Sequence, residues 1–191
     1  MIHLGGDEVD QTCFDENPNI QIFFRYHPSI GNYSQLVVMH MNKSRDLLTN
    51  INPHKKALYW SNPDTFYQKY HPNDILVYWG PSTKIHELQT LYPNNSYVMA
   101  PVDYYYLDCS FGNKYGGQSW CDPMKNWWRI YQFEPSDYLN GTAMLGSEVP
   151  VWSEIMGEGS IHAKIWPRAA AMADKLWGKR GVVDLVAVTQ R

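Results

Sequence analysis

The sequence predicts an α/β fold built from parallel β/α units, and three observations support this. Short apolar runs alternate with longer amphipathic segments along the 191 residues. Nearly continuous apolar runs are typical of parallel strands covered by helices. Acidic and aromatic residues repeatedly follow these runs, where a (β/α)8 barrel carries its active site. A complete barrel needs roughly 250 residues, so the sequence predicts either a smaller open sheet or part of a barrel with about five units.

The individual elements follow from local patterns. Short apolar runs predict strands at residues 1–5, 56–60, 75–80, 98–100 and 143–145. Apolar residues spaced by three and four predict helices at residues 33–50, 83–91 and 163–177. Pro167 is expected in the first turn of the last helix, where its missing N–H costs little.

Composition and charge limit the classes of function. A hydrophobic fraction of 44% argues against wholesale disorder. The net charge of −3 leaves no basic excess for binding phosphates, so no nucleic-acid partner is expected. No apolar run reaches the roughly 18–20 residues of a membrane span. The 8 Trp and 14 Tyr residues suit a flat, hydroxylated ligand, although aromatic residues also build cores.

Glycosylation sequons bear on the compartment. The chain carries N-x-[ST] motifs without a central proline at Asn32, Asn42, Asn94 and Asn140. They indicate passage through a secretory pathway, or coincidence in an Asn-rich sequence. No signal peptide is predicted at Met1, because the first residues include neither a basic segment nor a long apolar segment.

The three cysteines also bear on the compartment. Cys109 and Cys121 flank a Gly-rich stretch, and a disulfide across it would stabilise the fold by a few kcal/mol. Such a disulfide would indicate an oxidising compartment; the alternative is two reduced thiols. The odd count leaves Cys13 without a partner within the chain. No paired C-x₂-C motif or histidine cluster points to metal.

An acidic motif follows the first predicted strand. Residues His3 to Val9 read HLGGDEV, so two glycines precede Asp7 and Glu8 at a strand end. Two carboxyl groups in different environments can divide acid and electrostatic roles, as glycoside cleavage requires. A solvated acidic turn is the alternative for this motif alone. A metal site at His3, Asp7 and Glu8 is disfavoured, because His3 is expected to pack within the barrel.

Aromatic and polar residues follow the later strands. Rings at strand ends could wall a pocket against the C–H faces of a sugar, although each could instead pack in the core; the candidates are Trp60, Trp79, Trp127 and Trp152. Tyr106 and Asp108 lie two residues apart, and so do Trp152 and Glu154. Such pairs offer the donors and acceptors that sugar hydroxyls need.

Together these residues resemble glycoside hydrolase family 20, the β-N-acetylhexosaminidases. The similarity covers essentially the whole chain. It rests on His3-Leu4-Gly5-Gly6-Asp7-Glu8-Val9 with Cys13, Tyr104 to Cys109 and Cys121, Trp127 to Tyr131 with Glu134-Pro135, Gly146 to Glu154, and Trp166 to Trp177. The resemblance implies an α/β fold that is a partial (β/α)8 TIM barrel, comprising roughly the last five β/α units.

The resemblance also implies a retaining mechanism in which the substrate's 2-acetamido oxygen displaces the leaving group. It implies that Glu8 is the general acid/base, that Asp7 binds the acetamido N–H, and that Tyr106 holds the acetamido carbonyl. The implied sugar-binding residues are Trp60, Trp79 and Trp152 around the acetamido methyl and the ring, Asp108 and Glu154 on hydroxyls, and Trp127 in the same site. The family pattern implies no cofactor and no metal.

The family barrel has further β/α units before the GGDE strand, usually preceded by a smaller α/β domain. Residues 1–191 are therefore interpreted as the C-terminal portion of the catalytic barrel, with the usual partner of Cys13 in the absent part. The resemblance implies a lysosomal or secreted enzyme that acts on N-acetylhexosamine-containing glycans, with a possible homodimer in the full-length protein. The alternative is a truncated, inactive relative that binds amino sugars.

Overall fold

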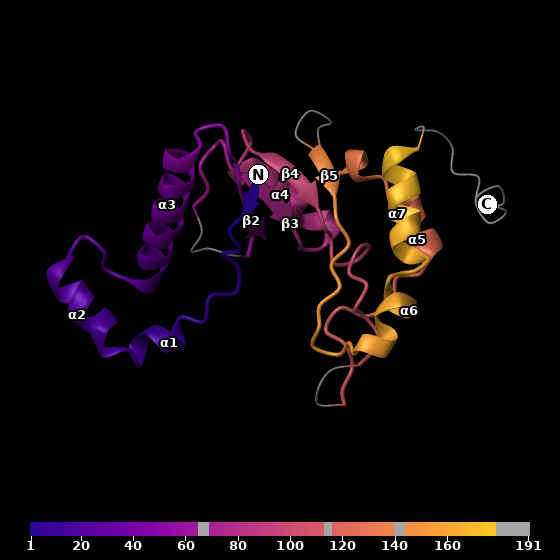
Figure 1. The fold of residues 1–191 in the computed structure, drawn as a ribbon, viewed down its shortest axis with the longest axis horizontal. Helices are drawn as coiled ribbons and strands as arrows, with labels where there is room; N and C mark the ends of the chain where they lie inside the picture. The colour runs from indigo at the N-terminus through magenta and orange to yellow at the C-terminus, as the bar shows by residue number, and fades with distance from the viewer. Residues whose placement is uncertain (65–68, 113–115, 140–143, 179–191) are drawn as a thin grey trace.

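A computed structural model describes residues 1–64, 69–112, 116–139 and 144–178. In these ranges five strands form one sheet in which every neighbouring pair is parallel. The strands are β1 (Ile2–His3), β2 (Ala57–Ser61), β3 (Ile75–Tyr78), β4 (Ser96–Met99) and β5 (Met144–Ser147). The predicted parallel α/β fold is confirmed, although Ala143 of the predicted last strand lies outside the described residues. Figure 1 shows the sheet at the centre, between groups of helices.

The strands lie in the sheet in their order along the chain, from β1 to β5. Consecutive parallel neighbours linked by crossovers are the arrangement found in a (β/α)8 barrel. Only the pairing of β4 with β5 is irregular, with a register shift between Tyr97 and Val98. Because all strands point the same way, their carboxyl ends share one edge, and that edge is where ligands bind in such folds.

The first helix layer covers β2. Helix α3 (Tyr33–Ile51) begins at Asn32, whose side chain accepts a hydrogen bond from the Gln35 N–H, as a helix cap should. This helix confirms the one predicted at residues 33–50. Its buried residues pack with those of β2 in one hydrophobic cluster, which comprises Val37, Met41, Leu48, Ala57 and Tyr59.

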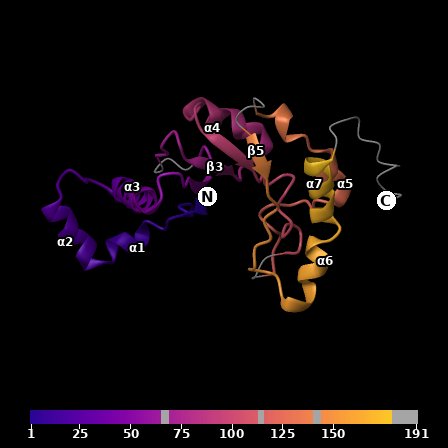
Figure 2. The same cartoon turned by 45° about the horizontal axis from the view of Figure 1, so that its top comes forward.

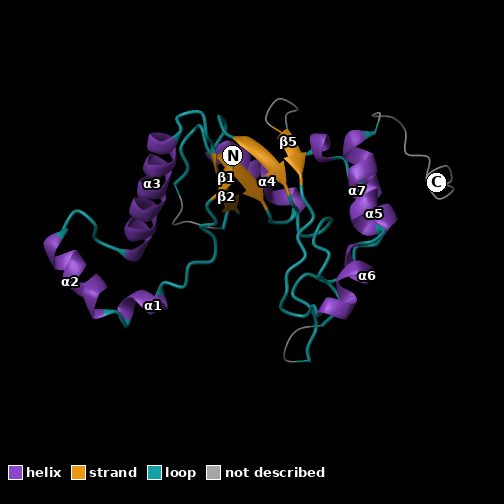
Figure 3. Ribbon diagram, viewed as in Figure 1, coloured by secondary structure: helices purple, strands orange, loops and turns teal. Residues whose placement is uncertain are grey.

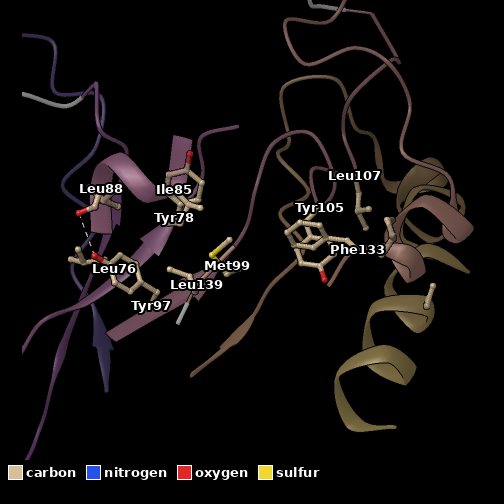
Figure 4. Packing of buried hydrophobic residues seen from close by; sticks show 12 residues of the cluster. Leu76, Tyr78, Ile85, Leu88, Tyr97, Met99, Tyr105, Leu107, Phe133 and Leu139 are labelled. Atoms are coloured by element: carbon tan, nitrogen blue, oxygen red, sulfur yellow. Dashed lines mark hydrogen bonds between the residues drawn. The ribbon is translucent and has the colours of Figure 1, made fainter. Parts of the chain in front are cut away.

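A second helix covers β3 and β4. Helix α4 (Ile85–Leu91) follows the 3₁₀ turn η1 (Ser82–Lys84), close to the helix predicted at 83–91. Ile85 and Leu88 pack against the outer faces of the strands in the largest cluster, with Leu76, Tyr78, Tyr97 and Met99. Figure 4 shows these six side chains together. Burying each of the Leu, Ile and Met side chains is worth about 1.5–3 kcal/mol.

Several short elements were not predicted from the sequence. They are α1 (Thr12–Asp15), α2 (Pro18–Tyr26), α5 (Trp127–Gln132), η2 (Pro135–Asp137) and η3 (Glu158–Ser160). Helix α2 has local start signals, because the Asn17 side chain caps it and Pro18 occupies its first position. In Figures 1 and 3, α1 and α2 extend away from the sheet. No helix in the described ranges is both long enough and apolar enough to cross a bilayer.

The helix predicted at residues 163–177 is wrong as a single element. The structure has α6 (Ile161–Ile165) and α7 (Arg168–Trp177), with Trp166 extended between them at φ −99° and ψ 143°. A proline ring disfavours the helical conformation of the residue before it. Pro167 therefore precedes α7 instead of lying inside a longer helix. Figure 2 shows α7 beside α5, against which it packs.

An ion pair fastens the edge of the sheet opposite the carboxyl ends. Arg45 of α3 donates to both carboxylate oxygens of Asp74, with Nε–Oδ1 at 2.8 Å and Nη2–Oδ2 at 2.5 Å. Asp74 directly precedes β3, and its backbone carbonyl accepts from the Asn95 amide just before β4. The pair therefore ties one helix to the start of two strands.

Candidate active site

The acidic motif emerges from β1 through a turn that requires glycine. Gly5 and Gly6 have φ values of +68° and +93°, a region that side chains with a Cβ seldom adopt. The Gly5 N–H donates to Nδ1 of His3 at 3.0 Å, which closes the turn. Glu8 is held at φ +46°. A non-glycine residue in this conformation is strained, and such strain gathers at functional sites.

Tryptophan rings connect the first strands to the loop after β5. The backbone N–H of Trp60 donates to the Gly5 carbonyl at 3.2 Å, so β2 continues its pairing alongside the glycine turn. The Trp60 ring lies 5.0 Å from the His3 ring and 5.5 Å from the Trp152 ring. Burial lowers the pKa of His3, and the charge of Asp7 partly opposes this. The carboxyl-end edge of the sheet therefore brings together residues distant in sequence.

Tyr106 joins this cluster from the segment after β4. Its ring centroid lies 6.4 Å from that of Trp152. Burial raises the pKa of Tyr106, and a hydrogen bond from the Trp152 side chain partly opposes this. The charge of Asp108, followed by those of Asp7 and Glu8, raises the pKa further. Three carboxyl groups, those of Asp108, Asp7 and Glu8, therefore act on the phenol through their charges. A raised pKa keeps the hydroxyl protonated, so Tyr106 is available as a hydrogen-bond donor.

Asp108 is a buried carboxyl group whose bonding is incomplete. It is 6% exposed, and its Oδ1 has no hydrogen-bond partner among the described residues. Burial raises its pKa, and so does the charge of Glu154, whereas the Trp152 backbone N–H and the charge of Lys164 lower it. Nε1 of Trp79 is likewise buried without a partner in the described structure. Buried polar atoms are almost always bonded, so these two atoms are candidates for binding a polar ligand.

A disulfide packs against Tyr106 and the tryptophan rings. Cys109 and Cys121 are bonded, with their Cα atoms 5.2 Å apart, so the disulfide expectation is confirmed and the reduced alternative is wrong. The two cysteines and Tyr106 are buried together, and Trp79 and Trp152 pack against them. Cys13 is free and exposed.

Two further residues at this end of the sheet were not predicted from the sequence. Trp120 is 67% exposed, and its ring lies edge-on to that of Tyr106 at 5.7 Å. Its position next to Cys121 is the signal that could have identified it. Glu148 directly follows β5, and burial raises its pKa. A polar residue directly after a strand is the signal that identifies Glu148.

Glu154 and Trp127, the remaining predicted site residues, differ in their surroundings from those described above. Glu154 is exposed and acts on Asp108 through its charge. Trp127 is the first residue of α5 and packs against the largest hydrophobic cluster. In the described part of the chain, no three His, Cys, Asp or Glu side chains gather closely enough to hold a metal ion.

The sequons differ in their surroundings. Asn32, Asn42 and Asn94 are exposed, whereas Asn140 lies outside the described residues. The Asn32 side chain caps α3, and Oδ1 of Asn42 accepts from Nη1 of Arg45 at 2.8 Å. Glycosylation at these four sites stays a prediction.

Carboxyl groups at the carboxyl edge of a parallel barrel sheet are compatible with glycoside cleavage, which uses two acidic side chains in most families. The sequence matches the family described as "Glycosyl hydrolase family 20, catalytic domain" over residues 1–180. The chain belongs to this family.

Known relatives agree with this assignment. The chain is 28% identical over 190 residues to the human "Beta-hexosaminidase subunit beta", covering 97% of this chain and 32% of the relative. It is 29% identical to a "Probable beta-hexosaminidase" of Arthroderma benhamiae, covering 92% and 33%. The chain thus spans about a third of the length of these relatives. A family 20 exo-β-N-acetylglucosaminidase from Vibrio harveyi has the same fold, with a TM-score of 0.76 at 20% identity over 98% of this chain and 29% of that one.

Proposed function

We propose that this chain is part of a β-N-acetylhexosaminidase that removes terminal non-reducing N-acetyl-β-D-hexosamine residues from glycoconjugates or chitooligosaccharides. Family membership and the named relatives support this reaction class. The observation that carries the proposal is the chain of ring contacts through Trp60 and Trp152, which joins the strand that precedes Asp7 and Glu8 to Tyr106, although about 100 residues separate the two segments.

The proposed mechanism uses the substrate as its own nucleophile. The protonated Tyr106 hydroxyl donates to the acetamido carbonyl oxygen and holds it below the anomeric carbon. That oxygen forms a bond to the anomeric carbon while Glu8 protonates the departing glycosidic oxygen. Asp7 accepts from the acetamido N–H and stabilises the positive charge of the oxazolinium ring. Glu8 then removes a proton from water, which opens the ring with overall retention.

The same residues provide a site of suitable chemistry for the sugar. Trp60, Trp79 and Trp152 offer apolar ring faces to the acetamido methyl and to the C–H groups of the sugar. Oδ1 of Asp108 supplies an unused acceptor for a hydroxyl, and Glu154 lies near enough to Asp108 to share that role. Trp127 belongs to this set only as a prediction from the family pattern. No cofactor takes part in the proposed chemistry.

We further propose that residues 1–191 are the C-terminal portion of the family's catalytic barrel. The strand order from β1 to β5 fits five consecutive barrel units, and the chain covers about a third of its relatives. A disulfide and exposed sequons support a lysosomal or secreted location. A homodimer stays a prediction. Sequencing the transcript upstream of the Met1 codon tests the proposal: an open frame encoding the earlier units would support it, and an in-frame stop would contradict it.

Replacing the proposed general acid tests the function. In the native gene product, Glu8→Gln should lower kcat on an aryl N-acetyl-β-glucosaminide by on the order of 10²–10⁴-fold. Asp7→Asn should lower kcat more than it weakens binding, because it acts on charge that develops in the transition state.

Glu87→Gln is the matched control, since Glu87 is an exposed carboxylate on α4. Its activity should equal that of the wild type. Equal rates for Glu8→Gln and Glu87→Gln would remove Glu8 from the acid role. Binding of N-acetylglucosamine by a wild-type protein without turnover would favour the non-catalytic alternative.

A further inference from the structure

Arg168, the first residue of α7, is a buried guanidinium that donates to three different segments of the chain. It is 2% exposed. Its Nη2 donates to the Leu107 carbonyl at 2.7 Å and to the carbonyl of Lys164, and its Nη1 donates to the Lys125 carbonyl at 3.3 Å. A planar guanidinium presents five N–H donors in a rigid fork, whereas the three donors of an ammonium point in tetrahedral directions and rotate freely.

The bond to Leu107 has a special position in the sequence. The Leu107 carbonyl belongs to the peptide bond that precedes Asp108, and the Leu107 N–H belongs to the one that follows Tyr106. This N–H donates to the Pro150 carbonyl at 2.9 Å, and the side chain is fully buried in the largest cluster. Both peptide planes are therefore fixed, one by Pro150 and the other by Arg168.

The charged groups around Arg168 also connect it to Asp108. Burial lowers the pKa of Arg168, and Asp108 is the acidic group whose charge raises it. Two further cations, Lys164 and Lys125, lie in the same region: Lys164 donates to the Ile155 carbonyl at 2.7 Å, and Lys125 to the Cys121 carbonyl. Asp108 interacts with all three positive charges.

Simple packing does not account for this arrangement. Burying a guanidinium costs desolvation free energy, and an apolar side chain of similar size would fill the space at lower cost. The three hydrogen bonds all go to neutral backbone carbonyls, and one of them fixes the peptide of a site residue.

We propose that Arg168 is a positioning residue for hexosaminide hydrolysis: it holds the Tyr106–Asp108 segment in place and does not contact the sugar. This inference rests on the proposed function, since it assigns Tyr106 and Asp108 to the acetamido group and to a hydroxyl. Lysine at this position retains the charge but cannot bond the three carbonyls in one plane, so the segment shifts. A displacement of about 1 Å in such a group can cost on the order of 10²-fold in rate.

The test compares Arg168→Lys with Arg129→Lys. Arg129 is a matched control on α5: its Nε donates to the Asp103 carbonyl at 3.0 Å, and its guanidinium lies 4.9 Å from the Tyr104 ring. In the native gene product, Arg168→Lys should lower kcat/KM for an aryl N-acetyl-β-glucosaminide by on the order of 10–100-fold. Arg129→Lys should stay within about twofold of wild type. Equal effects of the two substitutions would overturn the proposal.

A mutant cycle separates positioning from general destabilisation. In a background that carries both Tyr106→Phe and Asp108→Asn, Arg168→Lys should cost less than about threefold more, because both groups that it positions are already impaired. Full additivity of the two losses would overturn the proposal.

Amide hydrogen exchange gives a readout that does not depend on activity. Exchange at Leu107 and Asp108 should be at least about tenfold faster in Arg168→Lys than in Arg129→Lys. Unchanged exchange would contradict the role of Arg168 even in an active enzyme. Faster exchange in a protein without hexosaminidase activity would instead show that Arg168 orders the segment and that the proposed function is wrong.

Discussion

At the scale of single residues, Lys125 shows how burial alters the chemistry behind the site. It is 1% exposed, and its ammonium donates to the carbonyl of Cys121. Burial lowers its pKa to about 8, and the charge of Arg129 contributes in the same direction. The folded protein therefore releases this proton at a lower pH than the unfolded chain does.

This shift predicts a pH dependence of stability. Between pH 8 and the ordinary lysine pKa of 10.5, the unfolded chain binds more protons at this residue than the folded protein. Stability should therefore rise with pH in that window. Urea unfolding from pH 7 to 10 should show the wild type gaining stability relative to Lys125→Met. A difference that stays flat or falls as the pH rises would contradict the assignment.

At the scale of elements, two ion pairs join neighbouring segments but differ in their exposure to solvent. In the Arg45–Asp74 pair, the side chains are 12% and 2% exposed. In the Lys84–Asp64 pair, they are 41% and 61% exposed. Removing one partner of a buried pair leaves an uncompensated charge, whereas an exposed pair is screened by water and salt.

The two pairs should therefore respond differently to substitution. Asp74→Ala should lower the free energy of unfolding by about 3 kcal/mol, and Lys84→Met should change it by less than about 0.5 kcal/mol. Denaturant unfolding of both variants measures the difference. Activity per folded molecule should be retained in Asp74→Ala, because the pair lies at the edge opposite the site. Similar stability losses in both variants would show that burial does not decide the contribution.

The elements also show which features a sequence can predict. The strands were predicted because continuous apolar runs mark a doubly covered parallel sheet. The split between α6 and α7 was not, because helical spacing continues across Trp166 and Pro167 while the backbone does not. Helix α2 was not predicted, although the Asn17 cap and the N-terminal proline are local signals for the start of a helix.

At the scale of the whole molecule, the fold explains why a site can be assembled from distant residues. The parallel sheet brings residues 7 and 8, Trp60, Tyr106 and Trp152 to one edge. Sequence position after a strand predicted this gathering. Residue type alone did not predict it: Trp127 packs against the core from a helix, and Trp120 joins the rings from a Gly-rich loop.

The central proposal is that the substrate's acetamido group performs the displacement. Its most direct test is the rate at which the native gene product hydrolyses two aryl glycosides, one with an N-acetyl group at C2 and one with a hydroxyl. Losing a well-oriented intramolecular nucleophile should lower kcat/KM by on the order of 10³-fold or more. Comparable turnover of the two glycosides, or a trapped ester between the sugar and Asp7 or Glu8, would contradict the mechanism.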